Sequence, residues 1–289
     1  VGGGGNYMEG TFFVGSALQK ADNIGVNPER QFKRVMDFHH WRINARALNS
    51  WLKQTAGVYD WLADHGVHYE AVKTAFIDGN RTWHMYKGGH GTVLVQEFST
   101  RIKAKGGEIM TSTPAQSLII EDGVVKGVKA VAKNGDTLTI RAGNTIIATG
   151  GFSGNKYLRE LHDPRVKGLG TDNLPGSTGE VAMAAVRVGG YLVGMDFIQS
   201  TPGAPAGKKM KIILNTKVAE SIYVDKRGSR IVDEGARRDQ IRDAVLATPE
   251  RYAYTVVDNE TYESYNSAVH SSVEEGIRIN EAWTAPTIR

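Results

Sequence analysis

The sequence predicts a mixed α/β fold, and three patterns support this prediction. A β-branched run at residues 145–149 stops at a Gly pair. This is typical of a short buried strand that ends where the backbone approaches a ligand closely. Alternating runs joined by Asp-Gly and Asn-Gly turns precede it and predict an antiparallel meander. Apolar residues spaced three and four apart predict helices around both features.

Helices are expected on both sides of the meander. Residues 31–65 carry apolar side chains at spacings near three and four, which predicts two helices. Residues 66–90 lack this period and contain an Asp-Gly-Asn turn, so we expect irregular structure there. The next helix should begin at Thr92 and end at the Gly pair 106–107, and an Ala-rich helix should span 181–188.

The remaining segments predict strands and a domain boundary. Before residue 145 we expect strands at 108–111, 115–121, 124–132 and 137–142. A stretch rich in Pro, Gly and Lys follows Met195, so we assign residues 1–196 to a first domain and 197–289 to a second. In the second domain we expect strands at 212–214, 221–224 and 252–257, and helices at 238–246 and from 258 or 259 onward.

Three motifs follow one another in the second half of the chain. The first is Ile-Ile-Ala-Thr-Gly-Gly-Phe-Ser-Gly-Asn at 146–155, and the second is Pro-Gly-Ser-Thr-Gly-Glu at 175–180. The third runs over 224–239 and contains Gly-x-Arg followed by Glu-x-x-x-Arg-Asp. In this order they resemble the fumarate reductase/succinate dehydrogenase flavoprotein family of FAD-dependent oxidoreductases. Three ordered motifs are far more specific than any one of them.

The resemblance implies an incomplete Rossmann-like FAD-binding domain that contains the meander, followed by part of an α+β capping domain. Covalently flavinylated members carry a His in the loop equivalent to 5–13, and none occurs here, so we expect noncovalent FAD. The G-x-G-x-x-G fingerprint and the family's closing segment are absent, so we expect a central fragment that binds FAD weakly by itself. The residues that the resemblance places at FAD are Gly4, Gly5, Asn6, Ala115, Thr149, Gly150, Gly151, Thr178, Gly179 and Glu180.

Arg238 occupies the position of the family's active-site acid. In the family, hydride passes from flavin N5 to one carbon of an activated alkene, and this Arg delivers a proton to the other. The resemblance therefore implies an ene-reductase that acts on a small-molecule alkene. The alternative is that Arg238 only forms an ion pair with Asp239, Asp233 or Glu234.

The substrate positions depart from those of fumarate reductases. Thr201 stands where those enzymes have a clamping His before Pro. Counting forward without a gap, Ile213 and Leu214 replace a Thr-Glu pair of the proton relay, and Lys217 replaces its Arg. A hydrophobic pair has no groups that carry protons. We therefore expect Thr201 and Lys217 at the substrate, which should be a bulkier or less charged enoate, enone or steroid-like acceptor rather than fumarate.

Two other functions stay open. One is a flavin dehydrogenase of the ketosteroid 1-dehydrogenase type, which would need a Tyr base in the cap. The candidates for that base are Tyr252, Tyr254, Tyr262 and Tyr265. The other is a degenerate, non-catalytic flavoprotein module, which the absence of a phosphate-binding loop from the whole gene would favour.

Composition limits the partners and the location. Cysteine is absent, which excludes disulfides, thiolate catalysis and iron–sulfur ligation within this chain, so the electron donor should be separate. The net charge of +4 is spread along the chain, so nucleic-acid binding has little support. The pair His39-His40 lacks the i,i+4 spacing of helical metal ligands, so we expect no metal. No long apolar run or signal peptide is apparent, which predicts a cytoplasmic protein without a membrane span.

Overall fold

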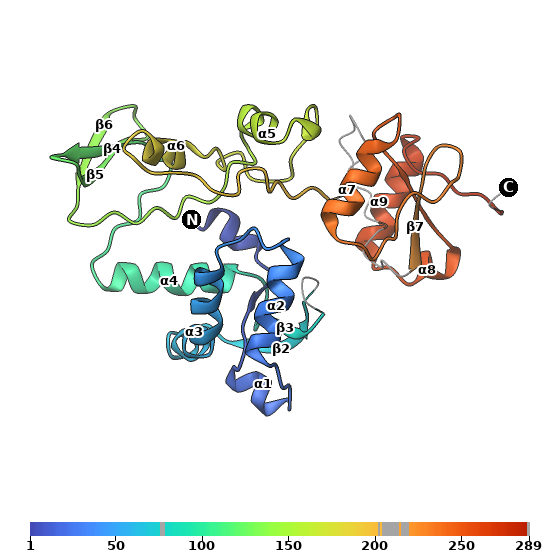
Figure 1. Ribbon diagram of the computed structural model, residues 1–289, viewed down its shortest axis with the longest axis horizontal. Helices are drawn as coiled ribbons and strands as arrows, with labels where there is room; N and C mark the ends of the chain where they lie inside the picture. Colours follow the sequence, from blue (N-terminus) through green and yellow to red (C-terminus); the bar gives the residue numbers. More distant parts are fainter. Residues whose placement is uncertain (76–78, 202, 204–213, 215–219, 288–289) are drawn as a thin grey trace. The chain divides into compact units, whose positions relative to one another are not determined.

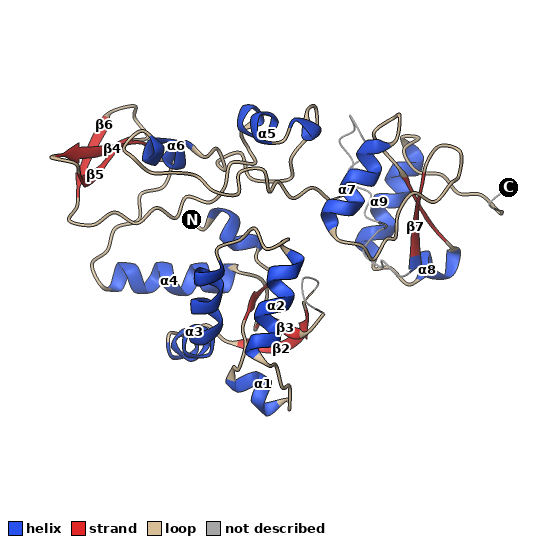
Figure 2. Cartoon of the chain, in the orientation of Figure 1, coloured by secondary structure: helices blue, strands red, loops and turns tan. Residues whose placement is uncertain are grey.

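The computed structural model describes residues 1–75, 79–201, 203, 214 and 220–287. The chain divides into two compact units, one formed by Val1–His162 with Gly170–Asp196 and the other by Asp163–Leu169 with Phe197–Arg289. Both contain helices and small antiparallel sheets, as Figures 1 and 2 show. The prediction of a mixed α/β fold is therefore confirmed.

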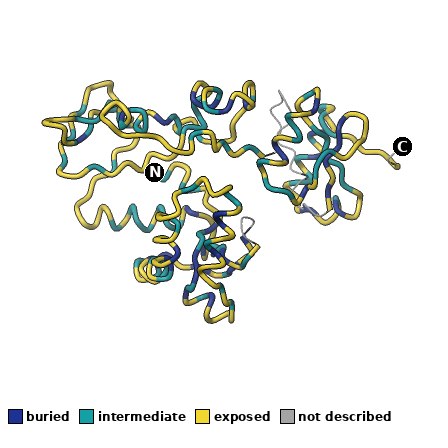
Figure 3. Tube along the Cα trace, viewed as in Figure 1, coloured by how far each residue is buried: buried dark blue, intermediate teal, exposed yellow. Residues whose placement is uncertain are grey.

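The N-terminal part of the first unit is built on a three-stranded antiparallel sheet. Its strands are β1 (Gly10–Phe12), β2 (Tyr69–Thr74) and β3 (Arg81–Tyr86), in the order β1-β3-β2. The helices between β1 and β2 are α1 (Ala17–Ala21), α2 (Pro28–Phe38) and α3 (Ala45–Asp64). The two helices expected within 31–65 are thus present. Figure 3 shows the burial along the chain, and the core of this part consists of Phe13, Leu62, Val67, Tyr69 and Tyr86.

The expectation of irregular structure over residues 66–90 is wrong, because this segment supplies β2 and β3. In β3 the buried side chains are Thr82, His84 and Tyr86, whereas Trp83 and Met85 are only half-buried. Every buried residue of the strand therefore carries a polar atom, and two of the largest apolar residues lie on the other face. This inversion hides the apolar/polar alternation from which a strand is normally recognised.

His84 is accommodated inside the core by hydrogen bonds to both ring nitrogens. Its Nδ1 donates to the Thr82 carbonyl at 3.0 Å, and its Nε2 lies 2.7 Å from the Ser16 hydroxyl. The ring also meets Phe13 edge to face, with 5.1 Å between the centroids. Burial lowers the pKa of His84, so the imidazole is neutral in the folded protein. The neutral tautomer with its proton on Nδ1 satisfies both bonds.

The Gly-rich N-terminus lies against α4 (Thr92–Ala104) as a short 3₁₀ helix, η1 (Gly3–Tyr7). Gly91, just before α4, allows this approach. Its N–H donates to the Met8 carbonyl at 2.7 Å, and a Cβ atom at this position would lie 2.0 Å from the Gly5 carbonyl oxygen. Any side chain at residue 91 would therefore collide with backbone. The predicted start of this helix at Thr92 is confirmed.

The meander forms as the turn residues predict. Strands β4 (Ala115–Glu121), β5 (Val124–Val131) and β6 (Thr137–Arg141) pair antiparallel in the order β4-β5-β6. Asp122 and Gly123 both have positive φ, 51° and 75°, which is the requirement of a two-residue hairpin turn. Glu121 and Arg141 form a two-pronged ion pair across the outer strands, at 3.0 and 2.6 Å.

Two further strand predictions are wrong. Residues 108–111 and 145–149 take no strand conformation, and the side chain of Ile146 is 91% exposed. A strand exists only through ladder hydrogen bonds to a neighbour. Among the described residues no segment pairs with either run. The strand propensity of β-branched residues does not produce a strand without such a partner.

The second unit contains a two-stranded sheet and three helices in its described part. Strands β7 (Ser221–Val224) and β8 (Tyr254–Val257) pair antiparallel. The helices are α7 (Arg238–Ala247), α8 (Asn259–Glu263) and α9 (Ser267–Arg278), with a 3₁₀ turn, η2 (Pro164–Val166). Residues 212 and 213 of the remaining predicted strand lie outside the described residues. None of the helices described in either unit has the length and apolarity needed to cross a lipid bilayer.

Candidate cofactor site

Two of the three sequence motifs meet in the first unit. The Gly154 N–H donates to the Ser177 carbonyl at 2.7 Å, and the Asn155 side-chain amide donates to the Thr178 carbonyl at 3.1 Å. The Oδ1 atom of Asn155 also accepts from the Leu158 N–H at 3.1 Å, which caps the start of α5 (Lys156–His162). Asn155 thus joins both motifs and α5. Asn is a preferred residue directly before a helix, so Asn155 is a signal from which the start of α5 could have been predicted.

Gly179 makes the close packing of these motifs possible. It has φ +74°, and a Cβ atom there would lie 2.8 Å from the Phe152 Cβ and 3.1 Å from the Leu158 Cδ1. Gly154 is similarly enclosed, since its Cβ would lie 3.0–3.1 Å from the carbonyl oxygens of Leu174, Pro175 and Ser177. Glycines in both motifs therefore allow the two motifs to pack closely against each other. The helix α6 (Glu180–Val186), which is labelled in Figure 1, begins directly after Gly179.

A cavity of about 790 Å³ lies beside the two motifs and brings three predicted FAD-binding residues together. These are Ala115 at the start of β4, Thr178 of the second motif and Glu180 at the start of α6. Cavities of roughly 300–1,000 Å³ are typical of small-molecule and cofactor sites. Its lining also includes residues that the sequence analysis did not place at FAD, among them Asn155, Tyr157 and Arg187.

Thr149, Gly150 and Gly151 lie in the exposed first part of the first motif. Gly150 has φ +74°, and no atom lies within 4 Å of a Cβ placed on Gly150 or Gly151. Unlike Gly154 and Gly179, these two glycines do not serve packing against the rest of the described chain. Their bare backbone is accessible to a ligand, which is the property that the sequence motif suggested.

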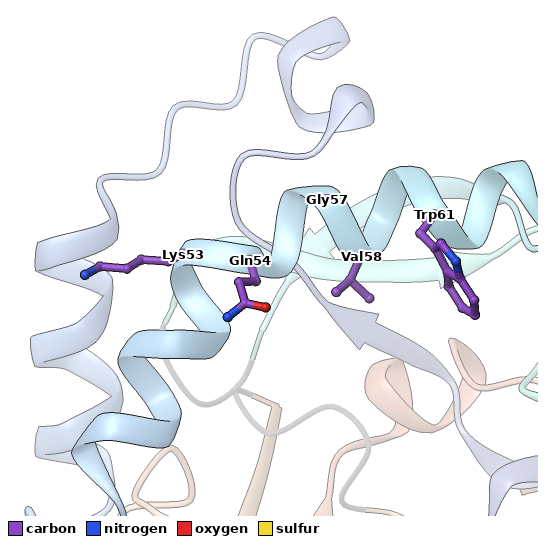
Figure 4. Close-up of a pocket in the computed structure, with 5 residues that line it drawn as sticks. All are labelled: Lys53, Gln54, Gly57, Val58 and Trp61. Carbon is purple, nitrogen blue, oxygen red and sulfur yellow. The ribbon is translucent and has the colours of Figure 1, made fainter.

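The other predicted cofactor residues lie elsewhere in the first unit. Gly4, Gly5 and Asn6 are on η1, and they are not among the residues that line the cavity. The Asn6 amide donates to the Val1 carbonyl at 2.9 Å. A smaller hollow of about 370 Å³ on α3 contains none of the predicted site residues. Figure 4 shows its lining, which consists of Lys53, Gln54, Gly57, Val58 and Trp61.

The third motif lies in the second unit and places Arg238 at the first residue of α7, where it is exposed. The three carboxylates considered as its partners form ion pairs with other arginines. Asp233 and Glu234 pair with Arg230, at 3.9 and 2.5 Å, and Asp239 pairs with Arg237 at 3.3 Å. Of the predicted substrate residues, Thr201 is exposed and Lys217 lies outside the described residues.

Substituting Gly179 should test whether the two motifs depend on this contact. Gly179→Ala forces a side chain into positive φ and against Phe152, so we expect a loss of about 1–3 kcal/mol in the free energy of unfolding. Gly176→Ala is the matched control, because nothing lies within 4 Å of its Cβ and its φ is not positive. That control should change stability by no more than ~0.5 kcal/mol. Denaturant unfolding measures both, and equal losses would contradict the packing argument.

Comparison with known proteins identifies the family. Residues 7–274 match the family described as FAD binding domain. The chain belongs to this family. Within it, the chain is of the fumarate reductase/succinate dehydrogenase flavoprotein type, as its three motifs predict.

Relatives of the FAD binding domain family are longer than this chain. The vinyl phenol reductase of Lactiplantibacillus plantarum is 33% identical over 253 residues, which cover 81% of this chain and 50% of that protein. The NADH:fumarate oxidoreductase of Klebsiella pneumoniae is 25% identical over 278 residues, 94% of this chain and 30% of that protein. A flavocytochrome c3 fumarate reductase has the same fold, with a TM-score of 0.77 at 22% identity, covering 92% of this chain and 48% of that chain. The chain spans half or less of the length of these relatives.

The residues present in the first unit fit FAD. The bare backbone of Gly150 and Gly151 and the polar groups around the cavity are the features that a dinucleotide cofactor requires. This fit agrees with the chain's membership of the FAD binding domain family.

Proposed function

We propose that the protein is an FAD-dependent reductase of activated alkenes. The observation that carries the proposal is the close packing of the first two motifs at Gly154 and Gly179. It lies beside a cavity that is lined by Ala115, Thr178 and Glu180. It is supported by relatives that are named reductases of vinyl phenol and fumarate. When bound and reduced by the electron donor, FAD would supply the hydride.

The residues of this chain would bind FAD noncovalently and orient it. The backbone N–H groups of Thr149, Gly150 and Gly151 are available as donors, and no Cβ hinders approach to the two glycines. The hydroxyl of Thr178 and the backbone of Ala115, which line the cavity, would also contact FAD. Gly4, Gly5 and Asn6 would add contacts from η1.

Arg238 would hold the proton that the substrate receives. Arg238 is the first residue of α7, directly after a loop that is fixed to β7, and it is exposed in this unit. Thr201 and Lys217 would contact the substrate, and a neutral Thr201 favours an alkene with fewer negative charges than fumarate. The electron donor would be separate, since this chain has no cysteine with which to hold an iron–sulfur cluster.

The alternative of a dehydrogenase with a Tyr base has less support. Such a base needs a lowered pKa, because it acts as tyrosinate. A hydrogen bond with Tyr252, together with burial, raises the pKa of Tyr254 instead. The Tyr265 hydroxyl donates to the Leu214 carbonyl, which fixes it in packing.

A flavin assay tests the proposal. Protein purified with its whole natural chain should be yellow and should release free FAD on heat denaturation, because no covalent bond is expected. After anaerobic photoreduction, its flavin should be reoxidised when an alkene is added. Protein that contains no flavin, or reduced flavin that no alkene in a broad panel reoxidises, would refute the proposal. Flavin that stays attached after denaturation would refute noncovalent binding alone.

A further inference from the structure

Glu234 is a buried carboxylate four residues before Arg238, on the loop between β7 and α7. Only 4% of the residue is exposed. Its Oε1 accepts a hydrogen bond from the Tyr223 N–H at 2.7 Å, and both of its oxygens accept from the Arg230 Nε, at 3.2 and 3.0 Å. The bond from the Arg230 Nη2 completes a two-pronged ion pair. Glu234 therefore ties its loop to the backbone of β7.

The electrostatics of Glu234 keep the carboxylate charged. Burial by itself raises the pKa of this group. The hydrogen bonds from Arg230 and from the Tyr223 N–H outweigh burial and leave the pKa below its usual value. The tie to β7 is thus present at neutral pH, and it consists of charge-assisted bonds, which are stronger than neutral ones.

The residues on either side of Glu234 transmit this tie to Arg238. On the N-terminal side, the Ile231 N–H donates to the Tyr223 carbonyl at 3.0 Å. On the C-terminal side, the Gly235 N–H donates to the Asp233 Oδ1 at 2.9 Å, which closes a tight turn. The Arg237 N–H then donates to the Gln240 Oε1 at 3.2 Å, and α7 begins. Little freedom remains between the tie at Glu234 and the first helical residue.

We infer that Glu234 is a positioning residue for Arg238. By fixing the loop to β7, it sets where α7 begins and hence where the Arg238 guanidinium is presented. This inference rests on the proposed function, because it assumes that Arg238 serves the reaction. A displacement of about 1 Å in a reacting group can cost about 10²-fold in rate, so a loosened tie should reduce turnover strongly.

The test uses the flavin-loaded enzyme with its whole natural chain. Glu234→Gln keeps the shape of the side chain but removes its charge, so we expect kcat to fall about 10²-fold with little change in KM. Glu275→Gln is the matched control. It breaks an ion pair of the same unit, between Glu275 and Arg278 on α9, which lies outside the loop between β7 and α7, so kcat should be unchanged.

A second variant covers the case in which Glu234→Gln does not fold. Arg230→Gln removes the other half of the ion pair. The Arg230 side chain is 56% exposed, so its replacement disturbs no core packing, and Gln still offers an amide donor near the buried Glu234 carboxylate. Glu234 would keep its bond from the Tyr223 N–H. We expect a fall in kcat of about tenfold, the factor that corresponds to losing roughly one hydrogen bond to a charged group. Normal turnover in folded Arg230→Gln and Glu234→Gln enzymes would overturn the inference.

A double mutant separates positioning from a general structural role. If Glu234 acts through Arg238, then Glu234→Gln should cause no further loss in an Arg238→Gln background. Equal factors in both backgrounds would overturn the inference. An Arg238→Gln enzyme that turns over normally would instead refute the role of Arg238 in the proposed function.

Hydrogen exchange gives a readout that does not depend on activity. In the 289-residue chain, Glu234→Gln should speed amide exchange over residues 235–239 and leave α9 unchanged. Unchanged exchange over residues 235–239 would overturn the inference.

Discussion

Replacement of Arg238 with Gln should abolish steady-state alkene reduction while leaving FAD content and the fold intact. A positioned proton donor contributes about 10²–10⁴-fold to a rate, so its removal should cost a factor in this range. The structure adds that Arg238 is exposed at the first residue of α7, where a substitution disturbs no core packing. Steady-state kinetics with a saturating alkene measure the loss, and flavin absorbance and thermal unfolding measure cofactor content and fold.

Arg237→Gln is the control for this prediction. Arg237 is the neighbouring residue of the same type, and its side chain pairs with Asp239 at 3.3 Å near the surface. Its loss should therefore change stability by no more than ~0.5 kcal/mol and leave turnover near that of the natural enzyme. If Arg238 were only an ion-pair residue, Arg238→Gln would lower the melting temperature, and activity would fall only with the amount of folded protein. Equal catalytic losses at the two positions would also exclude the assigned role.

Local signals in the sequence predicted the elements that depend on local chemistry. The Asp122-Gly123 pair predicted a hairpin because a two-residue turn requires positive φ at both positions, and the structure has it. The helix that starts at Thr92 and the one that follows Gly179 were predicted from their ends and composition. These features need no information about distant parts of the chain.

Elements that depend on distant partners were not predictable in the same way. Strand β3 was missed because its core contacts are made by Thr82, His84 and Tyr86, whose polar atoms find partners such as Ser16, far along the chain. The run at 145–149 has the propensity of a strand but no partner among the described residues. Strand formation is a property of pairs, so one sequence window cannot decide it.

The candidate site shows the same division. The motifs identified the residue types, including glycines that the structure finds in positive φ at 150 and 179. They did not reveal that Gly154 and Gly179 serve contact between the two motifs, whereas Gly150 and Gly151 are open. That distinction depends on packing between segments more than twenty residues apart, such as Asn155 and Thr178. It separates glycines needed for the fold from glycines available to FAD.

Fumarate should be a poor substrate compared with a neutral aryl alkene such as vinyl phenol. Fumarate carries two carboxylates, and each needs a cationic or hydrogen-bonding partner when it is desolvated. We propose that Thr201 takes the position of the clamping His, and its side chain brings no positive charge. A missing hydrogen bond to a charged group costs about 1.5–3 kcal/mol, which corresponds to about 10–150-fold in kcat/KM.

An anaerobic stopped-flow experiment measures this preference directly. Photoreduced enzyme is mixed with vinyl phenol or fumarate, and the rate of flavin reoxidation gives the ratio between the two. A Thr201→His variant provides the matched comparison, because it restores the side chain that fumarate reductases use. We expect it to raise the fumarate rate and leave the vinyl phenol rate almost unchanged, since a phenol does not need a cationic clamp. Fumarate reacting faster than vinyl phenol in the natural enzyme would show that the gap-free count placing Thr201 and Lys217 at the substrate is wrong, because some other cation would then have to hold the second carboxylate.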